Sequence, residues 1–151
     1  MGRFLNILVP VDGSPSSIAA LRQALALADG GVTRVHVLHV NAPDVTPEMV
    51  EAMADAERQL GDRLDRRTEV GEPVREILET ATAAQADLIV IGTHGRVGRL
   101  HALLGSVAEG VLRSAPCPVL TVRLATGEEE SFSERIHGRP SIAEQTRSPR
   151  R

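Results

Sequence analysis

The feature that most constrains the fold of this chain is an apolar segment that stops abruptly at a series of glycines. Leu88 to Ile91 shows no polar alternation, which is typical of a strand covered on both faces in the middle of a parallel sheet. Gly92, Gly95 and Gly98 follow it, and a Gly105-Ser106 pair comes later. Glycines let backbone N–H groups approach a ligand, and a helix beginning near Gly105-Ser106 would add unpaired N–H groups and the positive end of its dipole. The segment therefore predicts a binding site for an anion such as a phosphate group.

The spacing of these glycines resembles that of the nucleotide-binding loop in the universal stress protein family, in its ATP-binding branch. Two residues separate Gly92 from Gly95, and nine residues separate Gly95 from Gly105-Ser106. Three further segments occur where this family has similar ones, in the same order: 9–14 (Val-Pro-Val-Asp-Gly-Ser), 71–73 (Gly-Glu-Pro) and 116–122 (Pro-Cys-Pro-Val-Leu-Thr-Val). The resemblance covers residues 4 to 124.

The resemblance implies both a fold and a ligand. The fold is a five-stranded parallel sheet of order 3-2-1-4-5, with a crevice between the first and fourth strands. ATP would bind there, with its adenosine held by Asp12 and by an apolar wall at Val40. Whether Mg²⁺ or Mn²⁺ accompanies the phosphates is left open, and no metal site made by the protein is expected. The nucleotide-binding residues implied are Pro10, Val11, Asp12, Val40, Ile91, Gly92, Gly95, Arg99, Gly105, Ser106 and Val107.

Composition limits the class of protein. A chain of 151 residues is long enough for one domain with a real core, which must be aliphatic because Phe4 and Phe132 are the only aromatic residues. The net charge is −3 with both signs mixed along the chain, so neither nucleic acid nor a membrane surface is an expected partner. A single cysteine and the lack of any apolar run near about 18 residues favour the reducing cytoplasm.

Apolar periodicity and capping signals predict strands that alternate with helices. Serine or threonine followed by proline is typical of a helix start, with proline at the first helical position, and Glu72-Pro73 is interpreted as a further start. The predicted strands are 4–11, 33–40, 64–70, 88–91 and 117–123, and the predicted helices begin at 14–15, 46–47, 72–73 and 105–106. The first helix is expected to end at Gly30-Gly31 and the last before Pro116. The third strand is the least certain because Arg66-Arg67 interrupts it. The pattern predicts a single doubly wound, Rossmann-like α/β sheet with helices on both faces.

Several polar residues near the predicted crevice have two interpretations. Asp12 follows the first strand, where it could bind a ribose or adenine group or merely shape an Asp-Gly turn. Arg96 and Arg99 could pair with phosphate oxygens or form a solvated basic loop. Thr93 and Ser106 both offer hydroxyls, and Ser106 is the better candidate because its N–H would point toward the phosphates from the start of a helix.

Other side chains suggest no chemistry of their own. His36 and His39 are three residues apart on a strand, so they lie on opposite faces and make a poor pair of metal ligands. Cys117 has no Cys-x-x-Cys partner, which favours a small buried residue over a reactive thiol.

The sequence divides into a nucleotide-binding domain (1–124) and a polar tail (125–151) that is expected to be flexible. The favoured function is an ATP-binding regulator of the stress response that hydrolyses little or no ATP. It would act as a homodimer through Val119 to Val122, an apolar segment expected at the edge of the sheet. One alternative is a slow ATP-hydrolysing or adenylating enzyme, which the missing Gly-Lys-Ser/Thr loop disfavours. Another is a dimeric interaction module that binds no nucleotide, which the glycine pattern disfavours.

Overall fold

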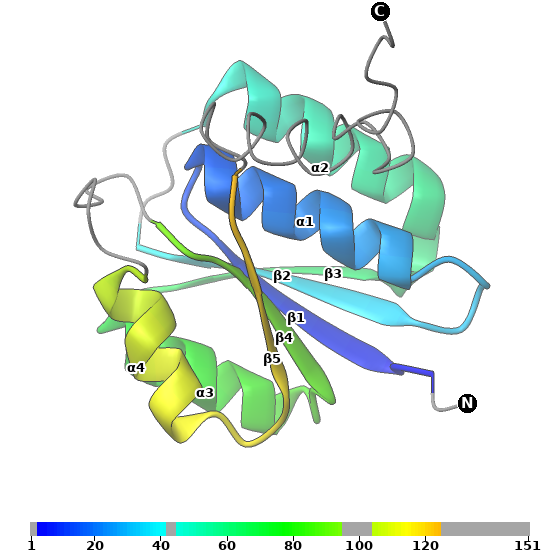
Figure 1. The fold of residues 1–151 in the computed structure, drawn as a ribbon. Coiled ribbons are helices and arrows are strands. Elements are labelled where there is room, and N and C mark those ends of the chain that lie inside the picture. The colour runs from blue at the N-terminus through cyan, green and yellow to red at the C-terminus, as the bar shows by residue number, and fades with distance from the viewer. Residues whose placement is uncertain (1–2, 42–44, 95–103, 125–151) are drawn as a thin grey trace, which may run out of the picture.

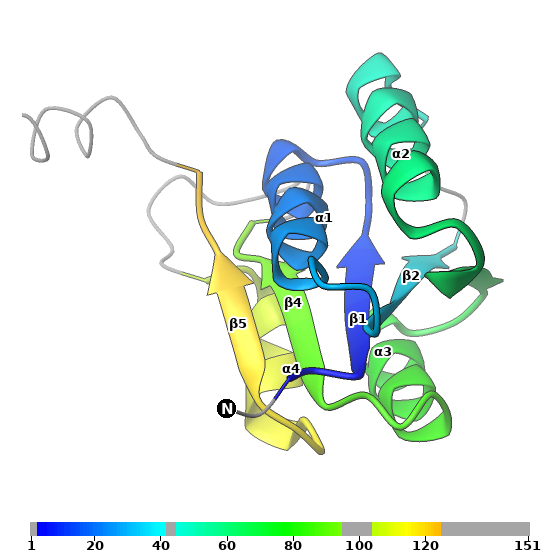
Figure 2. The same ribbon diagram turned by 90° about the vertical axis from the view of Figure 1, so that its right-hand side faces the viewer.

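The computed structural model describes residues 3–41, 45–94 and 104–124 (Figure 1). The strands are β1 (Asn6–Val11), β2 (Arg34–Val40), β3 (Leu64–Glu69), β4 (Leu88–Gly92) and β5 (Val119–Val122). The helices are α1 (Pro15–Leu27), α2 (Pro47–Leu60), α3 (Pro73–Ala83) and α4 (Ser106–Ser114), and a short 3₁₀ turn, Gly61–Arg63, precedes β3. The strands form one parallel sheet in the order β3-β2-β1-β4-β5, and Figure 2 shows the arrows of β1 and β5 pointing the same way. The predicted fold class and strand order are confirmed.

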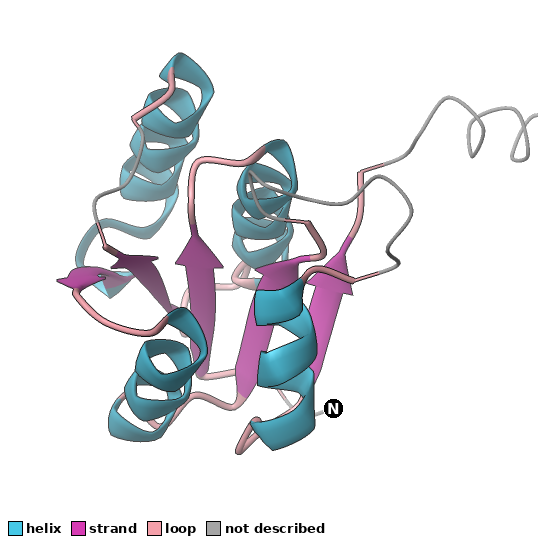
Figure 3. Cartoon of the chain, turned by 90° about the vertical axis from the view of Figure 1, so that its left-hand side faces the viewer, coloured by secondary structure: helices cyan, strands magenta, loops and turns pink. Residues whose placement is uncertain are grey.

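Helices α1 and α2 cover one face of the sheet and α3 and α4 cover the other, and Figure 3 shows helices on both faces. Because side chains alternate along a strand, β1 contributes Ile7 and Val9 to the layer under α1 and α2, and Leu8 to the layer under α3 and α4. All three side chains are fully buried. The core is aliphatic on both faces among the described residues, as the composition requires.

Three helices begin as predicted, each with a side-chain cap followed by proline. Ser14 Oγ accepts the Ser17 N–H at 3.3 Å, and Thr46 Oγ1 accepts the Met49 N–H at 3.2 Å. The Glu72 carboxylate accepts two N–H groups of the first turn of α3. Each cap satisfies helix donors that have no partner within the helix itself.

The end of the first helix differs from the prediction. Helix α1 stops at Leu27, and the N–H of Ala28 closes it on the Ala24 carbonyl at 2.9 Å. Gly30 and Gly31 have φ angles of 116° and 86° and form the turn that follows. The positive φ predicted for both glycines is confirmed, but α1 ends before them rather than at them.

The third strand, β3, is present at the edge of the sheet. Its charged side chains are tolerated there because they form ion pairs. Arg66 pairs with Glu57 of α2 at 2.7 Å, and Arg67 pairs with Asp65 at 2.7 Å. Asp65 also contacts the buried His36 at 3.0 Å, a hydrogen bond that lowers the pKa of the Asp65 carboxyl. Charged side chains on an edge strand discourage pairing with another chain, so this edge of the sheet is protected.

The last strand is shorter than predicted, and Cys117 lies outside it. The segment before Val119 is not paired as a strand, and the Cys117 side chain is half-buried where a buried one was expected. Burial, together with the charge of Asp87, raises the pKa of the Cys117 thiol. A thiol with a raised pKa is a poor nucleophile at neutral pH, in agreement with the inert role predicted for it.

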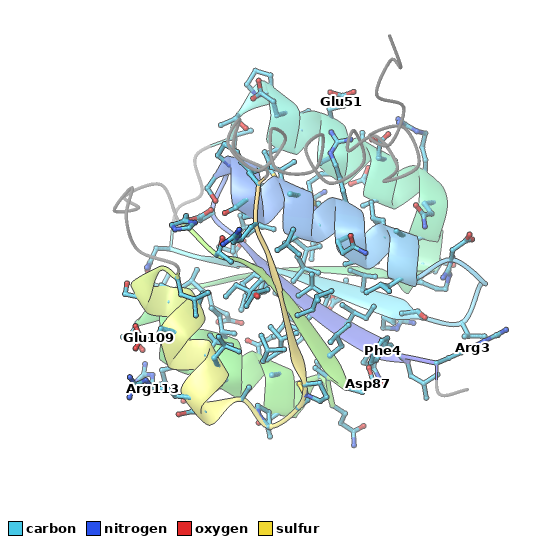
Figure 4. All side chains as sticks on the ribbon, viewed as in Figure 1. Arg3, Phe4, Glu51, Asp87, Glu109 and Arg113 are labelled. Carbon is cyan, nitrogen blue, oxygen red and sulfur yellow. The ribbon has the colours of Figure 1, made fainter. Side chains whose placement is uncertain are left out.

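Asp87 joins the amino-terminal ends of β1 and β4. Its two carboxylate oxygens accept the N–H groups of Leu5 at 2.7 Å and Asn6 at 3.1 Å, which ties the start of β4 to the start of β1. Figure 4 shows Asp87 and Phe4 near each other at this edge. No helix in the described ranges is long and apolar enough to cross a membrane.

Candidate functional site

The candidate site begins where β1 and β4 separate. The two strands pair only at Ile7 with Leu88 and at Leu8 with Ile89, although both continue further. The Asn6 carbonyl accepts a hydrogen bond from the Asp87 N–H, on the β4 side of β1. Backbone groups of every second residue point to the same side of a strand, so those of Pro10 also face β4. Proline has no N–H to continue this ladder. The sheet therefore opens between β1 and β4 at its carboxyl-terminal edge, which is where ligands bind in sheets of this topology.

Asp12 turns the chain at the end of β1. Its Oδ1 accepts the Ser14 N–H at 2.9 Å, and its own N–H donates to Ser17 Oγ at 3.3 Å. Gly13 between them has a φ of 82°, a conformation that suits glycine. The turn-shaping role considered from the sequence is therefore real. The Asp12 side chain is nevertheless exposed at the open edge, so the same carboxylate is accessible to a ligand.

Gly92 ends β4 against the first turn of α1. A Cβ on Gly92 would lie 2.6 Å from the Ser16 carbonyl carbon and 2.8 Å from its oxygen. Ser16 Oγ also donates to the His94 carbonyl, and the His94 N–H returns to Ser16 Oγ at 3.4 Å. Close packing of α1 on β4 is thus a sufficient reason for this glycine, and its predicted contact with a nucleotide stays a prediction.

Helix α4 starts beside the end of β4 without a side-chain cap. The N-cap residue is Gly105, and its N–H donates to the Thr93 carbonyl, which fixes the start of α4 next to β4. Among the four helices in the described ranges, α4 alone has no side-chain hydrogen bond at its N-cap. Within the helix, the first amide to find an acceptor is that of Glu109, which bonds the Gly105 carbonyl at 3.0 Å. The N–H groups of Ser106 and Val107 thus have no acceptor within the helix and carry the positive end of its dipole.

The remaining predicted residues fall into three groups. The side chains of Pro10, Val11 and Ile91 are buried, so only their backbone is available to a ligand. Ser106 is exposed, Val107 is half-buried, and Thr93, whose hydroxyl was considered for phosphate contact, is almost fully buried with Oγ1 3.0 Å from His94 Nδ1. That burial removes the Thr93 hydroxyl from the candidate contacts. Gly95, Arg96, Gly98 and Arg99 lie outside the described residues, as does the tail 125–151.

Val40 lies at the carboxyl end of β2, on the other side of β1 from the opening. It is the last residue of β2 and is half-buried against the layer formed by α3 and α4. Its neighbour His39 pairs in register with Val11, the residue before Asp12. Burial and the charge of Arg66 lower the pKa of His39 more than the Asp12 carboxylate raises it, so His39 is neutral at neutral pH. The His39 and His36 side chains lie on opposite faces, as predicted, and the described residues hold no group of three side chains able to bind a metal ion.

Two local structures near the site were not predicted from the sequence. One is the bond network that joins Ser16 to His94. The other is a pair of hydrogen bonds between Asn41 and Gly71, which connects the ends of β2 and β3. Asn41 has a φ of 65°, and an asparagine is a sequence signal for a turn with this backbone conformation. Its partner Gly71 could not be predicted, because it lies thirty residues away in the sequence.

Comparison with known proteins agrees with this architecture. The family model described as "Universal stress protein family" matches residues 3–123. A universal stress protein of Methanocaldococcus jannaschii is 33% identical over 142 residues, covering 80% of this chain and 82% of that protein. The solved structure of the universal stress protein UspA from Lactobacillus plantarum has a TM-score of 0.65 at 26% identity, covering 82% of this chain and 100% of that one.

A further solved structure is that of a universal stress protein in complex with cAMP. It has a TM-score of 0.65 at 30% identity and covers 81% of this chain and 98% of that chain. The family match spans every strand and helix of the described fold, including β1, β4 and the start of α4. This chain belongs to the universal stress protein family.

Proposed function

We propose that this protein is an ATP-binding regulator of the stress response, a cytoplasmic homodimer that changes its contacts with a partner according to the nucleotide bound. The phosphates bind the first turn of α4, with Gly92, Gly95, Arg99, Gly105, Ser106 and Val107 lining their path. The adenosine lies between Asp12 and Val40. Mg²⁺ or Mn²⁺, where present, is carried by the phosphates.

The observation that carries this proposal is the uncapped start of α4 beside the separated ends of β1 and β4. Helix N-termini attract anions because their N–H groups lack partners, whereas α1, α2 and α3 each have a side chain that caps their first turn. Asp12 offers hydrogen-bond acceptors to ribose hydroxyls from the end of β1. The complex of a related universal stress protein with cAMP supports an adenine nucleotide as the ligand.

A regulator fits these residues better than an enzyme. The chain has no Gly-Lys-Ser/Thr phosphate loop and no Asp or Glu between Gly92 and Ser106 to hold a metal ion at the phosphates. The N–H groups of α4 are hydrogen-bond donors only, and the Asp12 carboxylate is proposed to contact the adenosine rather than the phosphates. Steady release of phosphate at about 1 s⁻¹, the low end of ordinary enzyme rates, would favour the enzyme alternative.

ATP should stabilise the protein strongly. With a dissociation constant on the order of 1 μM, a thousandfold excess of ATP adds about 4 kcal/mol to the free energy of unfolding. For a domain of this size, that corresponds to a rise in Tm of about 10 °C or more. Thermal unfolding followed with and without millimolar ATP measures the shift. A Tm unchanged by ATP would reject the proposed function.

The asymmetry of the two sheet edges supports a dimer through β5. The β3 edge carries four charged side chains in a strand of six residues, whereas β5 is Val-Leu-Thr-Val. Leu120 remains 37% exposed at this edge, a large fraction for a leucine in a strand. An apolar edge strand favours pairing with a second copy of the same chain.

Replacing Thr121 with proline should convert the dimer to a monomer. The Pro118 and Val122 carbonyls accept hydrogen bonds from Ile89 of β4 and from Thr93 just after it. Backbone groups alternate sides along a strand, so the N–H of Thr121 faces the open edge of the sheet. Thr121→Pro therefore removes an outward N–H without removing a bond between β4 and β5. Light scattering at tens of micromolar should give twice the chain mass for the unmutated protein and the chain mass for the variant. A monomeric unmutated protein would contradict the proposed dimer.

A further inference from the structure

Asn41 fastens the end of β2 to the loop that follows β3. Its side-chain Nδ2 donates to the Gly71 carbonyl at 3.1 Å, and its Oδ1 accepts the Gly71 N–H at 3.1 Å. Its backbone N–H also donates to the Glu69 carbonyl at 2.7 Å. Three hydrogen bonds thus hold one exposed residue in a left-handed conformation, with φ of 65°. A non-glycine residue in this conformation is uncommon and persists where its surroundings hold it.

The partner loop is itself held in place. A Cβ on Gly71 would collide with the carboxylate of Glu76, so Gly71 lies directly against this side chain of α3. Glu76 is 9% exposed and pairs with Arg75 at 3.0 Å. Gly71 therefore packs against a nearly buried side chain of α3, next to the point where Asn41 contacts it.

The residue that Asn41 fixes is Val40, whose backbone faces the candidate site. The Arg34 N–H donates to Leu5 on the β1 side, whereas the Asn41 N–H donates toward β3. Backbone groups of successive residues point to alternate sides of a strand, so those of Val40 point toward β1. The last paired residue of β1 is Val11, opposite His39. The Val40 carbonyl therefore points past the paired end of β1, beside Asp12.

We propose that Asn41 is a positioning residue for the nucleobase. Through its two hydrogen bonds to Gly71, Asn41 sets the direction of the Val40 carbonyl at the carboxyl-terminal end of β2. A carbonyl is an acceptor only, so it favours a base with an exocyclic amino group at that place, such as adenine, over guanine, which presents a carbonyl there. The inference rests on the proposed function and adds to it the source of the preference for the base.

The test uses Asn41→Gly, which removes both side-chain bonds and keeps a residue that tolerates positive φ. Calorimetric titration with ATP, GTP and inorganic tripolyphosphate separates base recognition from phosphate recognition. For the unmutated protein, we expect ATP to bind at least tenfold more tightly than GTP. In Asn41→Gly, ATP affinity should fall about tenfold, so that this preference largely disappears. Tripolyphosphate should bind both proteins equally.

A second variant distinguishes positioning from simple stabilisation. Arg75→Ala removes the partner of Glu76 near the same loop but leaves both bonds between Asn41 and Gly71 in place. It should keep the ATP preference of the unmutated protein even if its Tm falls. An Asn41→Gly protein with a lower Tm but an unchanged ratio of ATP to GTP affinity would overturn the inference and leave the proposed function intact. An unmutated protein that binds no ATP would overturn both.

Discussion

Ser106→Pro should weaken ATP binding at least tenfold and leave the fold as stable as before. Ser106 is the first residue of α4, and its N–H is one of the donors proposed to bind phosphate. Proline removes that N–H but is well tolerated at the first helical position, where α1, α2 and α3 already carry it. Hydrogen bonds to a charged group contribute about 1.5–3 kcal/mol, so losing one costs about a factor of ten or more in affinity.

The conformation of the preceding residue makes this variant a clean test. Gly105 has φ of −70° and ψ of 162°, which is the extended conformation that a residue before proline adopts. The free energy of unfolding should therefore change by less than about 0.5 kcal/mol. Ser106→Ala is the matched control, because it removes the hydroxyl and keeps the N–H, and it should weaken ATP binding less than proline does. Equal binding by Ser106→Pro and the unmutated protein would exclude this N–H from the site.

Gly92→Ala should destabilise the protein by about 3 kcal/mol, the upper range for overpacking a well-packed site. The added Cβ would meet the backbone of Ser16, which cannot rotate away as a side chain could. The expected fall in Tm is about 10 °C, measurable by thermal unfolding without nucleotide. The same variant should disturb the contact between α1 and the end of β4.

Gly110→Ala is the matched control for this effect. Its Cβ would approach a side-chain methyl of Val74 at 2.7 Å, and that methyl can move. Alanine in the interior of a helix also gains about 1 kcal/mol over glycine, which offsets the contact. The net change should be close to zero. If Gly92→Ala were as stable as Gly110→Ala, the packing reason given for Gly92 would be wrong.

The fold could be predicted because its signals are local. The Ser14-Pro15 and Thr46-Pro47 caps, the apolar run 88–91 and the helix start at Gly105-Ser106 depend on neighbours within a few positions. The predicted ends of elements were less accurate. Helix α1, for example, ends with Ala28 as its C-cap, before Gly30-Gly31. Strand β3 was harder to predict because Arg66 and Arg67 interrupt its apolar pattern, and the partner of Arg66 is Glu57, a residue of another element.

The details of the candidate site could not be predicted because they depend on contacts between distant segments. Gly92 was expected to face a ligand, and nothing in a single sequence indicates that Ser16 occupies the space beside it. The Thr93 hydroxyl was predicted to be accessible, but the Thr93 side chain is buried in the fold. The bonds between Asn41 and Gly71 likewise join residues thirty positions apart.

The central claim is that a nucleotide binds at the opening between β1 and β4, with its phosphates on the first turn of α4. Amide NMR spectra of the ¹⁵N-labelled protein, recorded during titration with ATP, test it most directly. We expect the Ser106, Val107 and Gly13 amide resonances to shift and saturate together, while that of Arg66 on the β3 edge stays in place. Saturable shifts at the β3 edge with none at Ser106 and Val107, or no saturable shift at millimolar ATP, would contradict the account.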